Sequence, residues 1–422
     1  MTGPALPELL TFGCRLNAAE SDAMRRLAVE AGHADIAIVN TCAVTAEAER
    51  QARQALRRLR RERPGATIVI TGCAAQIHPQ TYAALPEADY VLGNAEKLDP
   101  AVWTALRGGP RLRVGDIFAT TAAPNAAVSD QRARAFVEVQ QGCDHRCTFC
   151  VIPYGRGNNR SAPLGGVVAK VRDLVRAGVN EVVLTGVDLV SWGSDLPGAP
   201  GFADLIGGLL RAVPALPRLR LSSLDPAALD EAFFRLFAGE TRLMPHIHLS
   251  LQAGDDLILK RMKRRHSRQS ALMVAARLRQ ARPGMSLGAD LIAGFPTEDE
   301  AMFARSLALV AEARLDFVHV FPFSSRPGTP AQRMRPVRPD LVQTRAAALR
   351  AAAARAHSAF LASQVGRTVS VVVERSGRRG IAENFAPVRL DRAAAPCTIV
   401  EVTITGAERD ILRGAVNIAA AA

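Results

Sequence analysis

The sequence has little lysine, few aromatic residues and no long apolar run. Only four of its 53 basic residues are lysine, and aromatic residues occupy 5% of the 422 positions. No stretch approaches the ~20 consecutive apolar residues of a membrane-spanning helix, and residues 1–7 lack the basic start and long apolar core of a signal peptide. These absences argue against membrane and exported proteins, so we expect a cytoplasmic chain with no membrane partner.

Acidic residues are also too few to balance the arginine. The 53 basic and 40 acidic residues give a formal net charge of +13, and the pI is near 10.3. Scarce lysine and abundant alanine indicate a bias in genomic base composition, which selects arginine over lysine without changing the charge. That bias leaves the excess of positive charge unexplained, and the excess favours a polyanionic partner, above all nucleic acid.

Seven cysteines stand out against this background, and six of them follow ordered spacings. Cytoplasmic thiols are kept reduced, so such spacings indicate metal binding or catalysis rather than disulfides. At 422 residues the chain is longer than one hydrophobic core usually holds, and we expect two or three domains. A hydrophobic fraction of 48% and a charged fraction of 22% are typical of globular domains.

Three of the cysteines, Cys14, Cys42 and Cys73 (the first triad), each close a short apolar run. They recur about thirty residues apart, which is the length of one strand–helix–strand unit. Three successive parallel strands would therefore bring three thiolates to the same carboxyl edge of one sheet. Three soft ligands at one edge suit an iron–sulfur cluster or zinc. The alternative is three buried core cysteines, because free cysteine is often buried.

The next three, Cys143, Cys147 and Cys150 (the second triad), are close enough in sequence for one loop to wrap a cube of iron and sulfide. Three thiolates ligate three irons and leave the fourth open, and the amino and carboxylate groups of S-adenosylmethionine fit that open position. Zinc bound by the same cysteines and His145 is the alternative, although the spacing differs from the usual zinc motifs. The remaining Cys397 is expected in the core of a β module.

Apolar periodicity predicts an α/β chain in three parts. We expect a small parallel α/β domain over 1–125, a partial TIM-type (β/α)6 barrel over 130–365 and a small β-barrel of the oligonucleotide-binding kind over 366–422. The first part includes a fourth candidate strand at Tyr90–Gly93. The barrel strands are expected at Phe136–Gln140, Glu181–Thr185, Arg218–Ser222, His246–Leu251, Ser286–Ile292 and Phe317–Phe321.

The second triad and the residues around it resemble a known family. The pattern Cys-x3-Cys-x2-Cys resembles the radical S-adenosylmethionine superfamily, and residues 137–157 look like the methylthiotransferases within it. That family has the same layout over essentially the whole chain: an N-terminal three-cysteine domain, a radical core and a C-terminal RNA-binding barrel called TRAM. The combined six-cysteine pattern makes the resemblance specific.

The family acts on three main substrates: isopentenyladenosine in tRNA, threonylcarbamoyladenosine in tRNA and an aspartate of a ribosomal protein. Residues 11–17, 39–45, 71–76, 93–97 and 320–324 are most similar to the threonylcarbamoyladenosine branch. This resemblance implies methylthiolation of C2 of N6-threonylcarbamoyladenosine next to the anticodon, with the tRNA anticodon stem-loop as partner.

The resemblance also implies two [4Fe-4S] clusters and two roles for S-adenosylmethionine, as radical source and as methyl donor. A radical made at the second triad would take hydrogen from C2, a carbon on which acid–base catalysis cannot act. The first triad would hold the cluster that carries the sulfur, which is methylated and then joined to C2. No side chain would serve as general acid or base, and an external electron donor and sulfur source would be required.

Further site residues follow from the same resemblance. Asp188 and Thr297 depart from the residues that are usual in the family. The expected S-adenosylmethionine contacts are Phe149, Thr185, Gly186, Ser250, Gln252 and Ile292. The alternative for each of these residues is a purely structural role, as a hydrogen-bonded group at the end of a strand or as a packing residue.

RNA contacts are expected from Arg375, Arg378 and Arg379, in a loop of the C-terminal barrel. The arginines of helix 50–63 and the basic group 260–265 could also meet phosphates, but a solvated face is the preferred interpretation for both. Phe385 could stack on a base, although we expect it in the core of the small barrel.

Two kinds of rival function stay open. The first is the same chemistry on isopentenyladenosine tRNA or on a ribosomal-protein aspartate. The second, from another class, is a non-catalytic iron–sulfur protein that binds RNA. The positive charge and the last domain argue against a protein substrate, and the open-iron spacing argues against a mere carrier.

Overall fold

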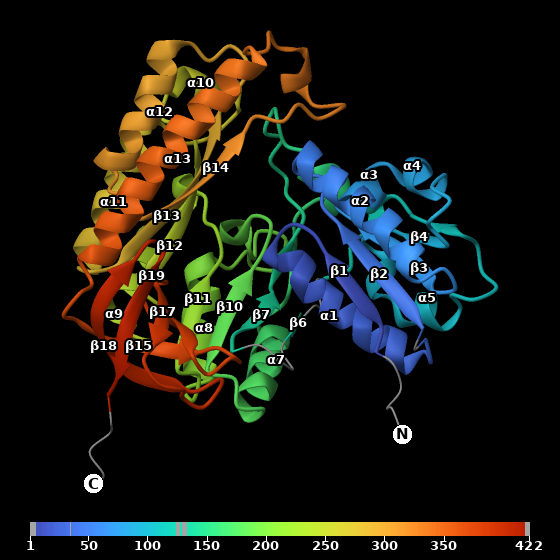
Figure 1. Ribbon diagram of the computed structural model, residues 1–422, viewed down its shortest axis with the longest axis horizontal. Helices are drawn as coiled ribbons and strands as arrows, with labels where there is room; N and C mark the ends of the chain where they lie inside the picture. The colour runs from blue at the N-terminus through green and yellow to red at the C-terminus, as the bar shows by residue number, and fades with distance from the viewer. Residues whose placement is uncertain (1–5, 34, 124–126, 129–132, 418–422) are drawn as a thin grey trace.

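The computed structural model describes residues 6–33, 35–123, 127–128 and 133–417. Its strands form an N-terminal parallel sheet, a central set of parallel strands and a closed C-terminal barrel (Figure 1). The N-terminal sheet lies beside the central strands, and the C-terminal barrel lies at the lower left in this view. The predicted α/β fold class is confirmed, while the expected domain limits stay predictions.

The N-terminal sheet has five parallel strands that are ordered as in the sequence. The strands are β1 (Glu8–Thr11), β2 (Ile36–Thr41), β3 (Thr67–Gly72), β4 (Tyr90–Leu92) and β5 (Leu112–Arg113). The helices are α1 (Arg15–Glu30), α2 (Ala46–Glu62), α3 (Cys73–Ile77), α4 (Pro79–Ala83) and α5 (Pro100–Thr104), with 3-10 turns η1 (Glu96–Leu98) and η2 (Ile117–Ala119). All four strands that the apolar runs predict in this part are present.

Helices cover both faces of this sheet, so every residue of β2 is buried. Val39 shares an apolar cluster with Leu56 of α2, and its neighbour Ile38 shares another with Met24 of α1. Alternate side chains of the strand therefore pack on opposite sides of the sheet. The result is a strand that can be recognised as a continuous apolar run, and it ends beside Cys42.

The central part has six parallel strands, and all six were predicted. They are β7 (Ala135–Glu138), β10 (Glu181–Thr185), β11 (Arg218–Leu221), β12 (His246–Gln252), β13 (Ser286–Ala293) and β14 (Phe317–Pro322). The order is β7, β10, β11 in one sheet and β12, β13, β14 in another, and parallel bridges Leu219–Leu243 and Leu224–Leu249 join the two. β6 (Ala127–Val128), between the two expected domains, pairs antiparallel with β7.

The first central strand is shorter than predicted. It ends at Glu138, and β8 (Gln140–Gln141) pairs instead with β9 (Arg160–Ser161). The accompanying helices are α6 (Ile152–Arg156), α7 (Leu164–Arg176), α8 (Phe202–Ala212), α9 (Glu231–Gly239), α10 (Asp256–Arg261), α11 (Arg268–Ala281), α12 (Glu300–Glu312) and α13 (Pro339–Ala362). Short turns are η3 (Leu189–Ser191), η4 (Pro226–Ala228) and η5 (Pro330–Arg333). In the described part of the chain, no helix has the length and apolarity needed to cross a membrane.

The central strands alternate between an apolar outer face and a polar inner face. Leu184, Leu249 and Leu291 belong to the largest apolar cluster, which the surrounding helices complete. The residues between them, such as His248 and Asp290, contact one another instead. This period of two is the expected pattern for strands whose outer face alone is covered by helices.

The C-terminal barrel is closed by five strands in the order β15-β16-β17-β19-β18. They are β15 (Thr368–Val373), β16 (Arg379–Ala382), β17 (Pro387–Leu390), β18 (Ile399–Glu408) and β19 (Ile411–Val416). Its core is built from alternate aliphatic residues such as Val371, Val388, Val402 and Leu412. Cys397, expected in this core, lies half-buried in the loop before β18, where its φ of 64° marks a turn.

This barrel docks on the amino ends of the central strands. Arg220 of β11 donates to the Ala382 and Glu383 carbonyls at 3.2 and 3.1 Å. Phe385 does not fill the small barrel, which corrects the expectation. It lies in the turn between β16 and β17 with φ 72°, points outward and stacks on His246 with ring centroids 4.5 Å apart.

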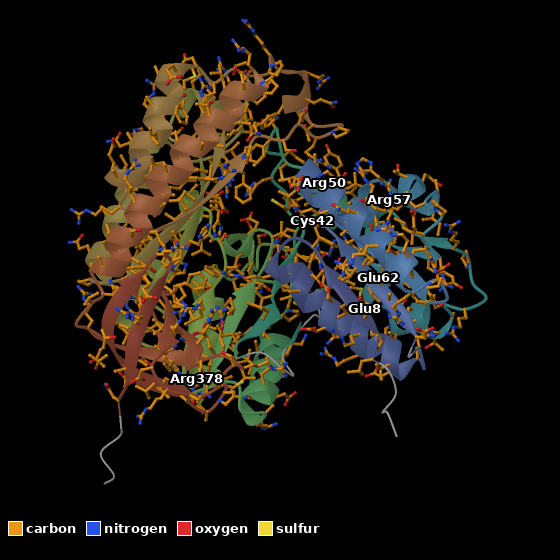
Figure 2. All side chains as sticks on the ribbon, viewed as in Figure 1. Glu8, Cys42, Arg50, Arg57, Glu62 and Arg378 are labelled. Atoms are coloured by element: carbon orange, nitrogen blue, oxygen red, sulfur yellow. The ribbon has the colours of Figure 1, made fainter. Side chains whose placement is uncertain are left out.

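The basic helix α2 lies on the outside of the N-terminal part (Figure 2). Arg50 pairs with Glu47 at 2.7 Å, and Arg58 pairs with Glu62 at 2.8 Å, with all four side chains more than half exposed. These contacts fit the preferred interpretation of a solvated face. In the second basic group, 260–265, Lys260, Lys263 and Arg265 are exposed as well. Arg264 is the exception, because its side chain is buried against Asp225 at 3.3 Å and reaches the second triad.

Candidate metal centres at the domain interface

The first triad forms where three parallel strands end. Cys14 follows β1 and precedes α1, Cys42 follows β2, and Cys73 begins α3 directly after β3. Burial, and then the negative charges of Cys73 and Cys14, raise the pKa of the Cys42 thiol to about 12. The three sulfurs therefore lie near enough to interact, and a metal must displace the protons of Cys14 and Cys42, whose pKa values burial raises, in order to bind.

Glycines allow the chain to turn tightly before these cysteines. Gly13 has φ 96°, and a Cβ there would lie 2.9 Å from the Cys42 Sγ. Gly72 has φ 97°, and a Cβ there would lie 2.3 Å from the Thr41 carbonyl oxygen. Both positions need the conformational freedom and the small size of glycine.

The second triad lies in the loop between β8 and α6. The Cys143 amide donates to the Gly157 carbonyl at 3.0 Å, which closes the loop, and Gly142 before it has φ 72°. Burial and then the charge of Asp188 raise the pKa of Cys143 to about 12. The buried guanidinium of Arg264 lies 3.9 Å from the Cys147 Sγ, so a cation faces this triad.

The two triads are adjacent, although they belong to different parts of the chain. Helix α3, which begins at Cys73, packs on α6, which follows Cys150. A Cβ at Gly155 of α6 would lie 3.1 Å from the Cys73 Cβ. Burial raises the pKa of Cys150 to about 12, and the charge of Cys73 contributes to that rise. Clusters on the two triads would thus be neighbours.

The spacing of the sulfurs fits clusters better than single metal ions. Four thiolates or imidazoles around one zinc ion lie about 3.8 Å from one another, given Zn–S bonds of about 2.3 Å. Among the described residues, the one set of three histidine, cysteine, aspartate or glutamate side chains whose ligand atoms lie within 4.8 Å of one another is His248, Asp290 and His319. Neither triad is that compact, as expected for ligands at separate corners of a cube.

The His145 side chain contacts a carboxylate outside the second triad. Its Nε2 lies 3.0 Å from Asp188 Oδ2, beyond the end of β10. Asp188 is held there by Ser191, whose hydroxyl donates to Oδ2 at 2.6 Å. This arrangement agrees with the interpretation that His145 is incidental to the metal site.

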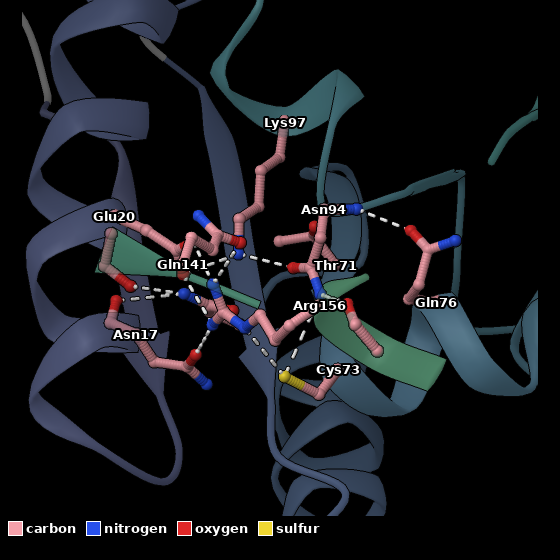
Figure 3. A network of polar contacts seen from close by, with 12 residues as sticks. Asn17, Glu20, Thr71, Cys73, Gln76, Asn94, Lys97, Gln141 and Arg156 are labelled. Atoms are coloured by element: carbon pink, nitrogen blue, oxygen red, sulfur yellow. Dashed lines mark hydrogen bonds and ion pairs between the residues drawn. The ribbon is translucent and has the colours of Figure 1, made fainter. Parts of the chain in front are cut away.

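A buried polar network connects the first triad to the central part (Figure 3). Arg156, at the end of α6, donates from Nε to the Cys73 Sγ at 3.1 Å and from Nη2 to Glu20 Oε2 at 2.9 Å. Lys97 donates to the same Glu20 oxygen at 2.6 Å. The three side chains are 0–1% exposed, so each charge depends on the others for compensation.

The protonation of this network follows from its pairing. Burial alone would raise the pKa of Glu20, but Arg156 and Lys97 lower it, so the carboxylate is ionised. Burial alone would lower the pKa of Arg156, but Cys73 and Glu20 raise it well above its usual value. A permanent cation therefore faces the Cys73 sulfur.

Amide side chains complete the network. Asn94 donates to the Gly155 carbonyl, accepts from Lys97 at 2.6 Å and approaches the Cys73 Sγ at 3.8 Å. Asn17 accepts from Arg156, and Gln141 accepts from it at 3.2 Å. Sequence reasoning missed these roles. The signal was available, because the family resemblance includes the residues around Asn17, Asn94 and Lys97, and Lys97 is one of only four lysines.

The expected S-adenosylmethionine contacts are only partly brought together. Phe149 and Ile292 lie in one apolar cluster, where Phe149 meets Phe295 edge to face at 6.3 Å. Thr185 is buried, and its hydroxyl donates to the Val137 carbonyl at 3.2 Å. A Cβ at Gly186 would lie 2.7 Å from Gln140 Oε1, so this glycine permits close packing.

The two expected contacts on β12 lie at its carboxyl end. The Ser250 carbonyl accepts from Arg264 at 2.7 Å, and Gln252 has φ 68°, which turns the chain away from the strand. These positions lie on the edge that carries the second triad. A role in cofactor binding stays a prediction for all six residues.

A basic groove lies between the C-terminal barrel and the central part. It has a volume of about 740 Å³ and is lined by Ala133, Arg134, Phe136, Glu374, Arg375, Ser376, Arg378, Arg379, Arg389 and Leu390. The three arginines expected to contact RNA therefore line one surface, together with Arg134 and Arg389. Figure 2 shows Arg378 on the C-terminal barrel, far from the basic helix α2.

Fold and cysteine arrangement together define a radical S-adenosylmethionine enzyme. Residues 137–310 match the radical SAM superfamily, and residues 8–93 match a family described as uncharacterized protein family UPF0004. Among solved structures, the radical S-adenosylmethionine methyltransferase TsrM from Kitasatospora setae, with cobalamin and a [4Fe-4S] cluster bound, has a TM-score of 0.51 and 16% identity. That likeness covers 75% of this chain and 67% of the other, and it shows the fold alone.

Curated relatives match almost the whole chain. A threonylcarbamoyladenosine tRNA methylthiotransferase MtaB of Rickettsia prowazekii (strain Madrid E) is 45% identical over 96% of each chain. One of Aquifex aeolicus (strain VF5) is 33% identical over 93% of this chain and 98% of the other. A tRNA-2-methylthio-N(6)-dimethylallyladenosine synthase of Anaeromyxobacter dehalogenans (strain 2CP-C) is 36% identical over 96% and 92%. This chain belongs to the radical SAM tRNA methylthiotransferase family.

Proposed function

We propose that this enzyme methylthiolates C2 of N6-threonylcarbamoyladenosine next to the anticodon of tRNA. The observation that carries the proposal is the meeting of two cysteine triads at the contact between α3 and α6. One triad alone would serve a radical enzyme, and the second supplies a separate place for sulfur. Relatives named for threonylcarbamoyladenosine, at up to 45% identity, support the choice of base.

The chain's own residues bind and orient the reactants. The second triad would hold the radical [4Fe-4S] cluster and the first triad an auxiliary one. When bound with S-adenosylmethionine, such a cluster supplies a radical that can take hydrogen from an unactivated carbon. Phe149 and Ile292 offer an apolar wall for the cofactor's adenine, with Thr185, Gly186, Ser250 and Gln252 at the strand ends. Arg156 and Arg264 each place a cation beside one triad.

The basic groove would hold the anticodon stem-loop by its phosphates. Arg375, Arg378 and Arg379 line it together with two further arginines, and such contacts release counterions when RNA binds. The reaction also requires an external electron donor and a sulfur source. A tRNA substrate implies a cytoplasmic location.

The decisive test combines cells and purified protein. Deletion of the gene should remove 2-methylthio-N6-threonylcarbamoyladenosine from the tRNA nucleosides measured by mass spectrometry. Protein reconstituted without oxygen should contain two clusters and release 5′-deoxyadenosine with dithionite and S-adenosylmethionine. An unchanged nucleoside profile would overturn the substrate, and loss of a 2-methylthio-dimethylallyl nucleoside would indicate the rival tRNA branch. Fully loaded protein that releases no 5′-deoxyadenosine would favour a non-catalytic carrier.

RNA binding is tested separately by salt dependence. Replacing Arg375, Arg378 and Arg379 with glutamine should weaken binding of a tRNA stem-loop and reduce the slope of log affinity against log salt by about 3 if each contacts one phosphate. The matched control replaces Arg50, Arg57 and Arg58 of the exposed face of α2. Equal losses in the two triple variants would contradict a specific role for the groove.

A further inference from the structure

The inner face of the central strands is lined by ionisable side chains, and nearly all of them are paired. Arg220 donates to Glu181 from Nε at 2.8 Å and from Nη2 at 3.1 Å, and both side chains are fully buried. Arg218 lies 3.6 Å from the same carboxylate. Glu181 and Arg218 are at the amino ends of β10 and β11, where the C-terminal barrel closes the interior.

One step further along the strands, Asp290 joins two histidines. Its Oδ1 lies 2.9 Å from His248 Nε2 and 3.1 Å from His319 Nδ1. Gly288 makes room for this arrangement, because a Cβ there would lie 2.3 Å from His248 Nδ1. The His319 side chain is 61% exposed. The inner face is therefore open at this level and can receive a molecule from outside.

Arg15 enters the same space from the N-terminal part. It directly follows Cys14 of the first triad, and its guanidinium lies over the Phe385 ring, 5.5 Å from the centroid. Its charge interacts with those of Asp290 and Glu181, and with the like charges of Arg134 and Arg220. Yet the Arg15 guanidinium makes no hydrogen bond or ion pair with any residue that the structure describes.

Charges of both signs act on the Arg15 guanidinium, and none of them belongs to a hydrogen-bonded partner among the described residues. The like charges of Arg134 and Arg220 act on it more strongly than the opposite charges of Glu181 and Asp290. A partly buried cation without a hydrogen-bonded partner is costly, and an anion brought by the substrate would compensate it. The space thus favours a ligand with a negative charge.

We propose that Arg15, with the His248–Asp290–His319 set, binds the threonylcarbamoyl group of the substrate base. This inference rests on the proposed function and deepens it. The carboxylate of that group would accept from Arg15, and its hydroxyl and urea N–H groups would face His319 and Asp290. A dimethylallyl group has no polar atom and would leave Arg15 unpaired, so the same residues exclude the rival tRNA substrate.

The position of Arg15 gives the proposal a functional consequence. Because Arg15 is the neighbour of Cys14, the residue that holds the modifying group is adjacent to a ligand of the first triad. Binding of the threonylcarbamoyl group would therefore fix the base beside the first triad, and only a correctly modified adenosine would be held there.

The test compares stem-loop RNAs that differ only in the group on N6 of one adenosine. The groups are threonylcarbamoyl, its neutral carboxamide, dimethylallyl and hydrogen, and binding to the full cluster-loaded chain is followed by fluorescence anisotropy. Wild-type protein should bind the carboxylate form about 10- to 100-fold more tightly than the carboxamide, as expected for a hydrogen bond to a charged group. Equal affinities would overturn the inference without any mutation.

Variants then assign that preference to residues. Arg15→Gln should reduce the preference to about 2-fold or less, Arg15→Lys should restore part of it, and His319→Gln should weaken binding of both polar groups. The matched control is Arg176→Gln, a 78% exposed side chain on α7. Iron content and electron paramagnetic resonance spectra must stay unchanged, which shows that Cys14 still holds its cluster.

The outcomes separate this inference from the proposed function. If wild-type protein forms the methylthio product but Arg15→Gln keeps the full preference for the carboxylate, only the inference fails. If wild-type protein modifies a different base, the proposed function fails. Stoichiometric zinc or manganese that is lost in His319→Gln would identify a metal site at His248, Asp290 and His319 and would also overturn the inference.

Discussion

The two triads reach similar surroundings by opposite routes. The second triad lies within one loop, so its geometry follows from spacing along the chain. The first triad is collected from the ends of β1, β2 and β3, which only the parallel sheet brings together. Both nevertheless have a glycine of positive φ before a cysteine and an arginine that donates to a sulfur.

The difference lies in how much of the molecule supports each triad. Arg156 contacts the Cys73 Sγ at 3.1 Å and is 1% exposed, whereas Arg264 lies 3.9 Å from the Cys147 Sγ and is 9% exposed. Arg156 also belongs to a network that spans two parts of the chain. The first triad should therefore be more sensitive to distant substitutions, and the predictions below test this comparison.

The largest effect is expected from the cysteines themselves. Cys147→Ala should abolish release of 5′-deoxyadenosine, while Cys42→Ala should leave that release and abolish only the methylthiolated RNA. Both products are measured by mass spectrometry after reconstitution without oxygen. Cys397→Ala, in the loop before β18, is the control and should change neither product. Equal loss of 5′-deoxyadenosine in Cys42→Ala and Cys147→Ala would contradict separate roles.

The next largest effect is a difference between Arg156 and Arg264 in their contribution to stability. Arg156→Gln leaves Glu20 and Lys97 without their buried partner and should lower the free energy of unfolding of the N-terminal part by about 3 to 5 kcal/mol. Arg264→Gln should lower the free energy of unfolding by only about 1 to 2 kcal/mol. Urea unfolding is followed by the fluorescence of Trp103, which is buried in the N-terminal part, in a Trp192→Phe background.

Cluster content gives an independent readout of the same pair. Electron paramagnetic resonance should show that Arg156→Gln loses the cluster of the first triad and keeps that of the second. Arg156→Lys should restore part of the first cluster. If Arg264→Gln destabilises the N-terminal part as much as Arg156→Gln does, the comparison between the triads is wrong.

The glycines should have smaller effects. Gly142→Ala brings a Cβ within 1.7 Å of the Asn158 carbonyl oxygen, and Gly72→Ala brings one within 2.3 Å of the Thr41 oxygen. Each should cost about 2 to 3 kcal/mol and weaken only its own cluster. Gly178→Ala is the control, since its φ is 87° but nothing lies within 4 Å; strain alone should cost about 1 kcal/mol. Equal costs at all three positions, measured by urea unfolding, would show that close contact is unimportant.

The smallest effect concerns pH. Burial, and then the charge of Glu20, raise the pKa of Glu138 to about 7. A carboxyl with a raised pKa in the folded protein stabilises it most below about pH 4.3, the unfolded value, and this contribution is lost as pH rises through about 7. Glu138→Gln should therefore gain stability over wild-type protein between pH 5 and 8 in urea unfolding at a series of pH values. A difference that does not vary with pH would refute this.

Much of the fold and the positions of the two triads in it were predictable from local patterns. The strand before Cys42 is a continuous apolar run because helices cover both faces of the sheet, and the loop of the second triad is defined by its own spacing. Phe385 was not predictable. An aromatic residue in a small β-barrel is expected in its core, and only the docking of the barrel on the central strands shows that it stacks on His246.

The sequence by itself determined the three strand ends, the two triads and the family, because these depend on short repeats and spacings along the chain. The tertiary structure alone decided that Arg156 faces Cys73, that Arg264 reaches Cys147 and that Arg15 lies among Asp290, Glu181 and Phe385. The reason is physical: in the sequence alone, a charged residue is equally compatible with a solvated surface and with a buried site. Burial and the partners that compensate its charge, supplied by distant segments, decide whether it belongs to a site.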